Sequence, residues 1–96
     1  MRRVDHAAIR RARIGRAEEK FNETAARLRV HPADVHRATQ WETLGTDERE
    51  AIVGEFLRGE KLADIADGAG VSASCVLRTV REAFSQARMA QCAAVT

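Results

Sequence analysis

The sequence has few of the residues that build disulfide-rich or aromatic-rich proteins. It holds two cysteines, one tryptophan, three phenylalanines, no tyrosine and a single proline, Pro32. Two cysteines are too few for a disulfide framework, and Cys75 and Cys92 lack the CxxC or Cys/His spacing of a metal site. We therefore expect a reducing compartment and packed helices rather than an aromatic-rich sheet.

Neither a membrane span nor an export signal is predicted. No run of apolar residues is long enough to cross a bilayer. The basic start, residues 1–6, is followed by neither an apolar segment nor a small-residue cleavage site, so a secretory signal is not expected. The expectation is a cytoplasmic protein without a membrane partner.

Length and motif content argue against catalysis. A chain of 96 residues has room for one compact domain or two minimal three-helix units that share a core, and neither leaves space for a deep cleft. The sequence lacks a Ser/His/Asp set, a nucleotide-binding glycine loop, an HExxH pair and a paired-carboxylate motif. We predict a binding protein that is not an enzyme and that uses no cofactor or metal.

Charge is unevenly distributed although the net charge is only +2. Residues 1–41 contain ten Lys/Arg against five Asp/Glu, whereas residues 42–96 contain six against nine. A basic half is typical of a protein that binds a polyanion, although charge alone does not separate DNA from RNA or from an acidic protein. The charge pattern favours a nucleic-acid partner.

The second half has the clearest helical pattern. Thr46 predicts an N-cap, the two acidic residues after it suit the first turn, and Gly59 predicts the end of that helix. Between them, apolar residues recur at helical spacing. A second, short helix is expected over 61–68. The apolar residues of the two helices are Ile52, Val53, Phe56, Leu57, Leu62, Ile65 and Ala66.

A third helix is predicted to follow Ser72, which would cap it. The turn before it contains Gly70, which can adopt the positive φ that a tight corner between helices requires. Apolar residues at helical spacing predict a buried stripe, and three arginines lie off that stripe. The stripe is Val76, Val80, Ala83, Phe84 and Ala87, and the arginines are Arg78, Arg81 and Arg88.

Residues 62–76, LADIADGAGVSASCV, resemble the helix-turn-helix signature of bacterial and phage DNA-binding proteins. In that family a small residue at the position of Ala66 lets the two helices approach, and a glycine at the position of Gly70 makes the turn. Apolar residues at the positions of Val71, Val76 and Val80 fill the wedge between the helices. The resemblance covers about twenty residues. If the resemblance does not hold, the segment predicts only a helical hairpin.

The chain also contains an internal repeat. A shift of 41 residues without gaps aligns Ala25 with Ala66, Leu28 with Ala69, Val30 with Val71, Val35 with Val76 and Arg37 with Arg78. Residues 22–39, NETAARLRVHPADVHRAT, therefore resemble a second copy of the signature. Arg29 stands where the family prefers glycine, and Pro32 falls in the first turn of a helix, where proline is tolerated.

The leading helix of the first copy departs from this repeat. Arg11, Gly15 and Arg16 stand opposite the apolar Ile52, Phe56 and Leu57, so the packing register must differ. A narrow apolar face remains, and two further apolar residues after the first copy are expected to pack between the copies. The face is Val4, Ala8, Ile9, Ala12 and Ile14, and the two residues are Trp41 and Leu44.

The two copies together resemble the third and fourth regions of bacterial sigma factors. In those regions a unit like AARLRVHPADVHRA precedes one like DEREAIVGEFLRGEKLADIADGAGVS. The long connector and the promoter-melting regions of sigma factors are missing here. The resemblance therefore favours a small regulator that uses the same modules over a working sigma factor.

The resemblance assigns DNA contacts residue by residue. In helix-turn-helix proteins the third helix enters the major groove with outward side chains near its N-terminus. Arginine suits guanine and glutamine suits adenine. The outward residues are Ser72, Ser74, Arg78 and Arg81 in the second copy and His31, His36, Arg37 and Gln40 in the first. A basic cluster would track phosphate: Arg2, Arg3, Arg10, Arg11, Arg13 and Arg16.

Each of these residues also has a simpler interpretation. The arginines also fit ordinary solvated charges on a helix. His31 and His36 fit surface histidines better than metal ligands, since no Cys or carboxylate partner has suitable spacing. Ser72 reads as an N-cap alone. Cys75, near a helix start that lowers thiol pKa, is better explained as a small buried residue than as a redox sensor.

As a whole, the sequence predicts an all-α protein of two consecutive trihelical helix-turn-helix units, residues 1–44 and 45–90, with a frayed tail over 91–96. The predicted function is sequence-specific binding of double-stranded DNA by a transcriptional regulator. One chain is expected to grip successive major-groove faces, as a dimer of single units does. A monomer would then suffice, and a longer third helix would give a homodimer seam through Phe84, Ala87, Ala90, Gln91 and Ala94.

Two alternatives remain open. The second copy is acidic and presents Ala73 and Leu77 on its reading surface, which would read bases poorly. It would then dock a protein, as a co-regulator or antiactivator that binds a transcription factor or RNA polymerase. An accessory factor of recombination or DNA packaging would use the same fold and DNA-binding chemistry.

Overall fold

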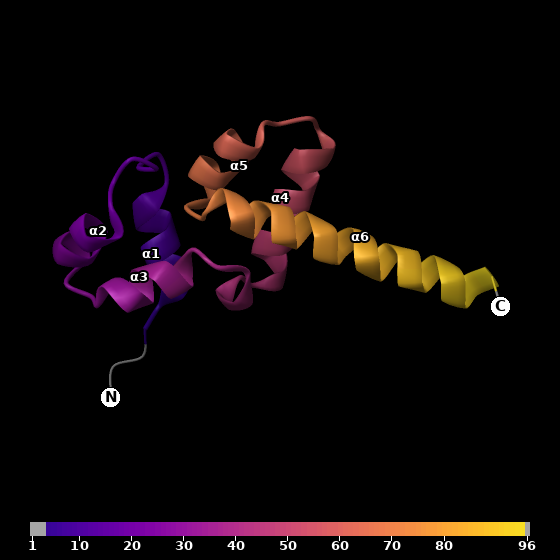
Figure 1. The fold of residues 1–96 in the computed structure, drawn as a ribbon, viewed down its shortest axis with the longest axis horizontal. Helices are drawn as coiled ribbons and strands as arrows, with labels where there is room; N and C mark the ends of the chain where they lie inside the picture. The colour runs from indigo at the N-terminus through magenta and orange to yellow at the C-terminus, as the bar shows by residue number, and fades with distance from the viewer. Residues whose placement is uncertain (1–3, 96) are drawn as a thin grey trace.

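A computed structural model describes residues 4–95 of the chain and the side chains of residues 4–88. All regular secondary structure in this part is helical, which confirms the all-α prediction. The elements are α1 (His6–Arg13), α2 (Phe21–Leu28), α3 (Pro32–Ala38), the 3₁₀ helix η1 (Trp41–Thr43), α4 (Thr46–Leu57), α5 (Leu62–Ala69) and α6 (Ala73–Val95). Figure 1 shows α1–α3, the first unit, beside η1–α6, the second unit, along the long axis of the molecule.

The first unit packs three short helices around a small core. Asp5 caps α1, since its carboxylate accepts a hydrogen bond from the Ala8 N–H at 3.0 Å. The core consists of Ile9, Ala25, Val35 and Ala38, with Phe21, Leu28 and Val30 packed against it. So few buried aliphatic side chains supply little hydrophobic stabilisation, which makes contacts with the second unit important for this half.

The second unit has the larger core. Its buried residues are Leu44, Ile52, Ile65, Ala66, Val71, Cys75 and Val76, with Trp41, Phe56, Leu62 and Ala69 packed against them. Trp41 and Leu44, expected between the units, thus belong to this core. Gly45 is the N-cap of α4, one residue before the predicted Thr46, because the Glu48 carboxylate accepts the Gly45 N–H at 3.2 Å.

The 41-residue repeat is present in the backbone. The bounds of α5 equal those of α2 shifted by 41, and α6 begins 41 residues after α3. Arg29 and Gly70 both end a helix with a left-handed φ, 57° and 69°. The next N–H donates back across each turn at 3.0 Å, from Val30 to the Ala25 carbonyl and from Val71 to the Ala66 carbonyl. Arg29 therefore takes the conformation that the second copy gives to glycine.

The long helix α6 differs from its prediction in two ways. Val76 and Val80 are buried as expected, but Phe84 and Ala87 are exposed, because the C-terminal part of α6 projects past the other helices (Figure 1). Residues 91–95, expected to be frayed, are helical, and Thr96 lies outside the described residues. None of the helices in the described part of the chain is both long and apolar enough to cross a bilayer.

Candidate nucleic-acid interface

The end of α3 meets the start of α6. The Thr39 carbonyl, just after α3, accepts hydrogen bonds from the Ser72 N–H at 3.3 Å and from the Ser72 hydroxyl at 3.2 Å. Ser72 Oγ also accepts the Cys75 N–H at 3.2 Å, which confirms Ser72 as a cap of α6. One serine thus caps the second candidate recognition helix and fastens it to the end of the first.

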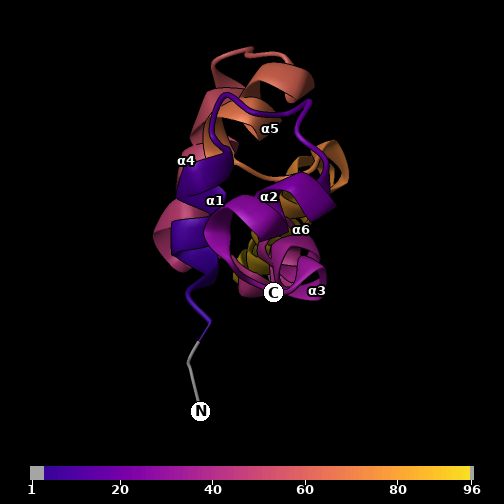
Figure 2. The same ribbon diagram turned by 90° about the vertical axis from the view of Figure 1, so that its left-hand side faces the viewer.

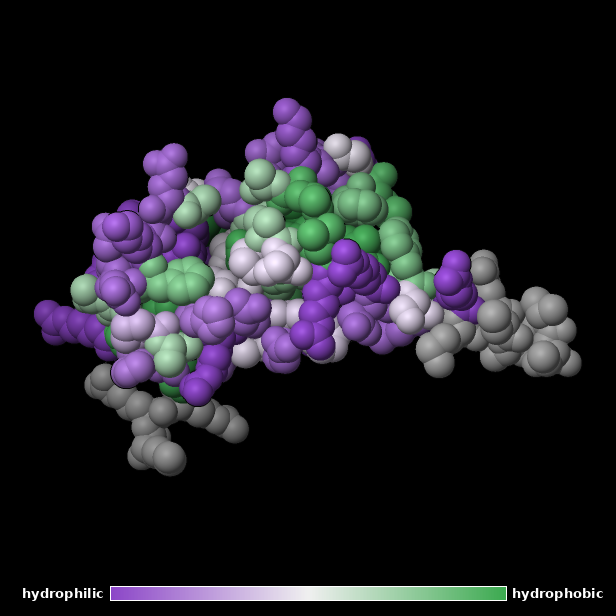
Figure 3. All heavy atoms as spheres, viewed as in Figure 1, coloured by the Kyte–Doolittle hydropathy of each residue, from purple (hydrophilic) through white to green (hydrophobic). Residues whose placement is uncertain are grey.

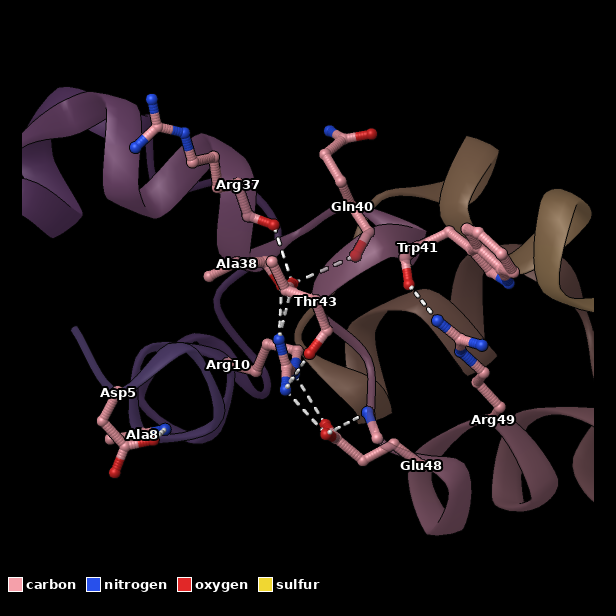
Figure 4. A network of polar contacts seen from close by, with 11 residues as sticks. Asp5, Ala8, Arg10, Arg37, Ala38, Gln40, Trp41, Thr43, Glu48 and Arg49 are labelled. Carbon is pink, nitrogen blue, oxygen red and sulfur yellow. Dashed lines mark hydrogen bonds and ion pairs between the residues drawn. The ribbon is translucent and has the colours of Figure 1, made fainter. Parts of the chain in front are cut away.

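This contact brings predicted site residues from both units onto one surface. Gln40 follows Thr39, Ser74 Oγ lies 3.1 Å from Ser72 Oγ, and Arg78 is one helical turn beyond Ser74. Arg37, one turn before Gln40, has 67% of its side chain exposed. Figure 4 shows the Arg37 and Gln40 side chains extending to the same side of the chain. We name Arg37, Gln40, Ser72, Ser74 and Arg78 the junction surface.

Arg78 is held by Trp41 and Glu42, two residues that the sequence does not indicate as its neighbours. Its guanidinium carbon lies 4.5 Å from the centre of the Trp41 ring, and its Nη1 donates to the Glu42 carboxylate at 2.8 Å. Arg49 also lies over Trp41, at 4.1 Å, and donates to the Trp41 carbonyl at 3.0 Å. Arg78 and Glu42 are both about half exposed, so their ion pair is weak and a phosphate can replace the carboxylate.

The two histidines predicted to contact DNA, His31 and His36, are exposed but have local contacts. His31 Nδ1 accepts the Ala33 N–H at 3.0 Å and so caps α3. The His36 ring packs edge-on against Phe21 at 5.7 Å. Among the described residues, no cluster of three or more His, Cys, Asp or Glu is arranged to hold a metal ion. His31 therefore has a capping role, and His36 lies on the outer face of α3.

Arg10 was predicted to join a basic face that tracks phosphate, but it is 3% exposed. Figure 4 shows its guanidinium inserted between the units. It donates to both Glu48 carboxylate oxygens at 2.6 Å, to the Ala38 carbonyl and the Thr43 hydroxyl at 3.0 Å, and to the Thr43 carbonyl at 3.3 Å. These bonds use all five N–H donors of an arginine. Arg10 is thus a structural link and not a contact for DNA.

Arg13 is also buried, with 7% exposed. It donates to the Thr24 hydroxyl and to the Glu19 carbonyl, and it lies 4.9 Å from the centre of the Phe21 ring. Hydrogen bonds from Arg27 and Thr24, with the charges of Arg27 and Arg16, lower the pKa of the Glu19 carboxyl to about 2. The polar contacts of Arg13 and Glu19 therefore hold the segment between α1 and α2 against α2.

The four remaining arginines of the basic cluster do not share one environment. Arg11 and Arg16 are exposed, but Arg16 pairs with Glu19 at 3.4 Å, and Arg11 lies close enough to Glu48 for its charge to lower the pKa of that carboxyl. Arg2 and Arg3 lie outside the described residues. Arg81 is exposed on α6. A single continuous basic face on α1 is therefore not formed.

Cys75 is a core residue. Its side chain is 2% exposed, and burial raises the pKa of its thiol. A thiol that stays protonated and inaccessible reacts poorly, since the thiolate is the nucleophile. The structure thus favours the small buried residue over the redox sensor.

Comparison of the chain with protein-family models, curated proteins and solved structures finds no match. The function of the chain is therefore inferred from its sequence and from the geometry of the junction surface.

Proposed function

We propose that this protein binds double-stranded DNA in a sequence-specific manner, as a cytoplasmic transcriptional regulator with tandem helix-turn-helix units. The supporting observation is the contact between the Thr39 carbonyl and Ser72, which brings the ends of two equivalent helices onto one surface. On that surface Gln40 suits adenine, the Ser74 hydroxyl can accept from or donate to a base edge, and Arg37 and Arg78 suit guanine or phosphate. Exposed arginines beside polar side chains are typical of surfaces that contact nucleic acid.

The test is a fluorescence-anisotropy titration against DNA from upstream of the gene that encodes the chain and against a scrambled duplex. We expect tighter binding to the upstream duplex that persists at physiological salt. If Arg37, Arg78 and Arg81 each neutralise one phosphate, log K falls with log salt with a slope of about −3. Equal and salt-labile binding to both duplexes, or no binding, contradicts the proposal. An accessory factor of recombination or packaging predicts the same binding chemistry but a different target duplex.

A second candidate function is protein docking by the second unit. Figure 3 shows apolar side chains gathered over α4 and α5, in contrast to the more polar first unit. A groove of about 560 Å³ runs between α4 and α6 beside Leu57, which is 67% exposed. Phe84, 49% exposed, packs edge-on against Phe56 at 6.2 Å. Exposed apolar groups beside acidic residues suit a protein partner such as a transcription factor or RNA polymerase.

Charge reversal separates the two candidates. Arg78→Glu combined with Arg81→Glu should abolish DNA binding if the junction surface contacts DNA. If the second unit only docks a protein, the first unit retains DNA binding after this change. Arg58→Glu, an exposed arginine at the end of α4, is the matched control and should leave affinity nearly unchanged.

A further inference from the structure

The contact at Ser72 limits how far apart the two candidate recognition helices lie. Their N-caps are His31 and Ser72. At a rise of about 1.5 Å per residue, the chain from His31 to Thr39 covers about 12 Å. The Ser72 N–H lies 3.3 Å from the Thr39 carbonyl oxygen, so the two N-caps lie within roughly 20 Å of each other.

That separation is too short for two half-sites on one face of DNA. Successive major grooves on one face recur about every 34 Å, and a dimer of single helix-turn-helix units spans that distance. The expectation from sequence that one chain grips successive major-groove faces is therefore not compatible with this arrangement.

Polar and steric contacts keep the units from moving apart. Arg10 joins α1 to the end of α3 and to α4. Gly70 lies against the Arg10 backbone so closely that a Cβ on Gly70 would be 2.0 Å from the Arg10 carbonyl oxygen. The Asp67 carbonyl accepts the Gly15 N–H, and the Asp67 carboxylate accepts the Ala17 N–H, both at 3.3 Å. Reaching a groove one turn away would break these contacts.

The two helices are arranged end to end. Figure 1 shows α3 and α6 running in the same direction along the long axis, with α6 beginning beyond the end of α3. The seven residues of α3 cover about 10 Å and the first nine of α6 about 13 Å. With the junction between them, the reading surface is about 25 Å long. At a rise of about 3.4 Å per base pair along the DNA axis, this length covers at most about seven base pairs.

Resting on the proposed function, we propose that one chain reads a single uninterrupted block of at most about seven base pairs within one major groove. Gln40 and Arg78, which belong to different units, then contact base pairs within about three of each other. In this arrangement the two copies of the repeat form one composite reader instead of two independent ones.

The experiment starts from duplexes selected by the full-length protein from a randomised pool. The number of chains per duplex is measured by analytical ultracentrifugation, and the phosphates that each chain contacts are mapped by ethylation interference. The selected duplex is then shortened from 24 to 12 base pairs around the motif. Gln40→Ala and Arg78→Ala are used to find the base positions whose preference each residue sets, with Arg58→Ala as control.

The proposal predicts one block of conserved bases for each bound chain. When one chain is bound, shortening the duplex should weaken affinity less than threefold. The base positions at which Gln40→Ala and Arg78→Ala relax the sequence preference should lie within about three base pairs of each other. A complex of two chains with one block of conserved bases under each chain also supports the proposal, because each chain then reads a single block. Two blocks a helical turn apart under a single chain would overturn the composite reader while leaving DNA binding intact. Failure to enrich any duplex would overturn the proposed function as well.

Discussion

The Arg10 guanidinium and the Glu48 carboxylate form a bidentate ion pair between the units, with Nε–Oε2 and Nη2–Oε1 distances of 2.6 Å (Figure 4). In Figure 2, viewed from the first unit, α1, which carries Arg10, lies in front of α4, which carries Glu48. Burial opposes ionisation of Glu48, but the hydrogen bonds from Arg10 and from the Gly45 N–H outweigh it, so the pKa of this carboxyl is below its ordinary value. The pair thus fixes the relative position of the two candidate recognition helices.

Replacing Arg10 should destabilise the whole chain. In Arg10→Met the Ala38 and Thr43 carbonyls lose their donor and Glu48 loses its counter-ion, so we expect a loss of about 3 kcal/mol in the free energy of unfolding. Urea denaturation followed by circular dichroism measures it. Arg11→Met, a change at the exposed neighbour, should cost less than about 0.5 kcal/mol. Equal effects of the two variants would show that the buried network does not matter.

Gly70→Ala should be more disruptive than an ordinary glycine substitution. The residue has φ 69°, and its Cβ would meet the Arg10 carbonyl oxygen at 2.0 Å. We expect a loss of at least about 2 kcal/mol, since both backbone strain and displacement of α1 are involved. Gly68→Ala, in α5 with no atom within 4 Å of its Cβ, should instead stabilise by about 0.5–1 kcal/mol. A neutral Gly70→Ala would contradict the close approach, and thermal unfolding of both variants decides it.

Glu19 should contribute stability that disappears in acid. Its folded pKa of about 2 lies below the ordinary value of 4.5, so the contribution is fully present above about pH 4.5 and is lost as the pH falls toward 2. The Tm of the protein should therefore exceed that of Glu19→Gln at pH 7, and the two should converge near pH 2. Glu48 is present in both proteins, so its contribution to the pH dependence of Tm cancels in the difference. A difference in Tm that does not change with pH would contradict the low pKa.

Removing the charge of Glu42 should strengthen DNA binding. Glu42 neutralises Arg78 and would lie near the phosphates in the proposed complex. We expect Glu42→Gln to raise affinity about three- to tenfold at low salt, with a smaller gain at high salt because exposed charges are screened. Glu60→Gln, at an exposed position between α4 and α5, is the matched control. Weaker binding by Glu42→Gln would place Arg78 outside the interface.

The sequence predicted the parts of the fold that local chemistry decides. The turns and the start of α6 could be predicted from Gly70, Ser72 and the 41-residue repeat, because helix ends are determined by residues close in sequence. The roles of Arg10 and Arg13 were missed, because a cluster of arginines reads as a solvated face and the partners of Arg10 are 28 to 38 residues away. The sequence did contain one signal of these buried roles: Arg10 and Arg13 are three residues apart and lie beside Ile9 on one helical face.

The junction surface was predicted only as separate residues. The bond from Ser72 that builds the junction surface is accepted by the backbone carbonyl of Thr39, and a backbone carbonyl is present at every residue, so the sequence does not indicate it. The aromatic ring beneath Arg78 was likewise expected between the units and not at the site. Contacts of this kind depend on how helices pack, which one sequence without structure does not specify.

The most direct test of the account is the affinity of a Gln40→Ala and Arg78→Ala double variant for the selected duplex at physiological salt. Two lost base contacts on one surface predict at least a 30-fold weaker Kd, at about 1–3 kcal/mol for each contact. Circular dichroism should show the fold unchanged, and Arg58→Ala should bind as the unmodified protein does. Unchanged affinity of the double variant would show that the junction surface does not contact DNA.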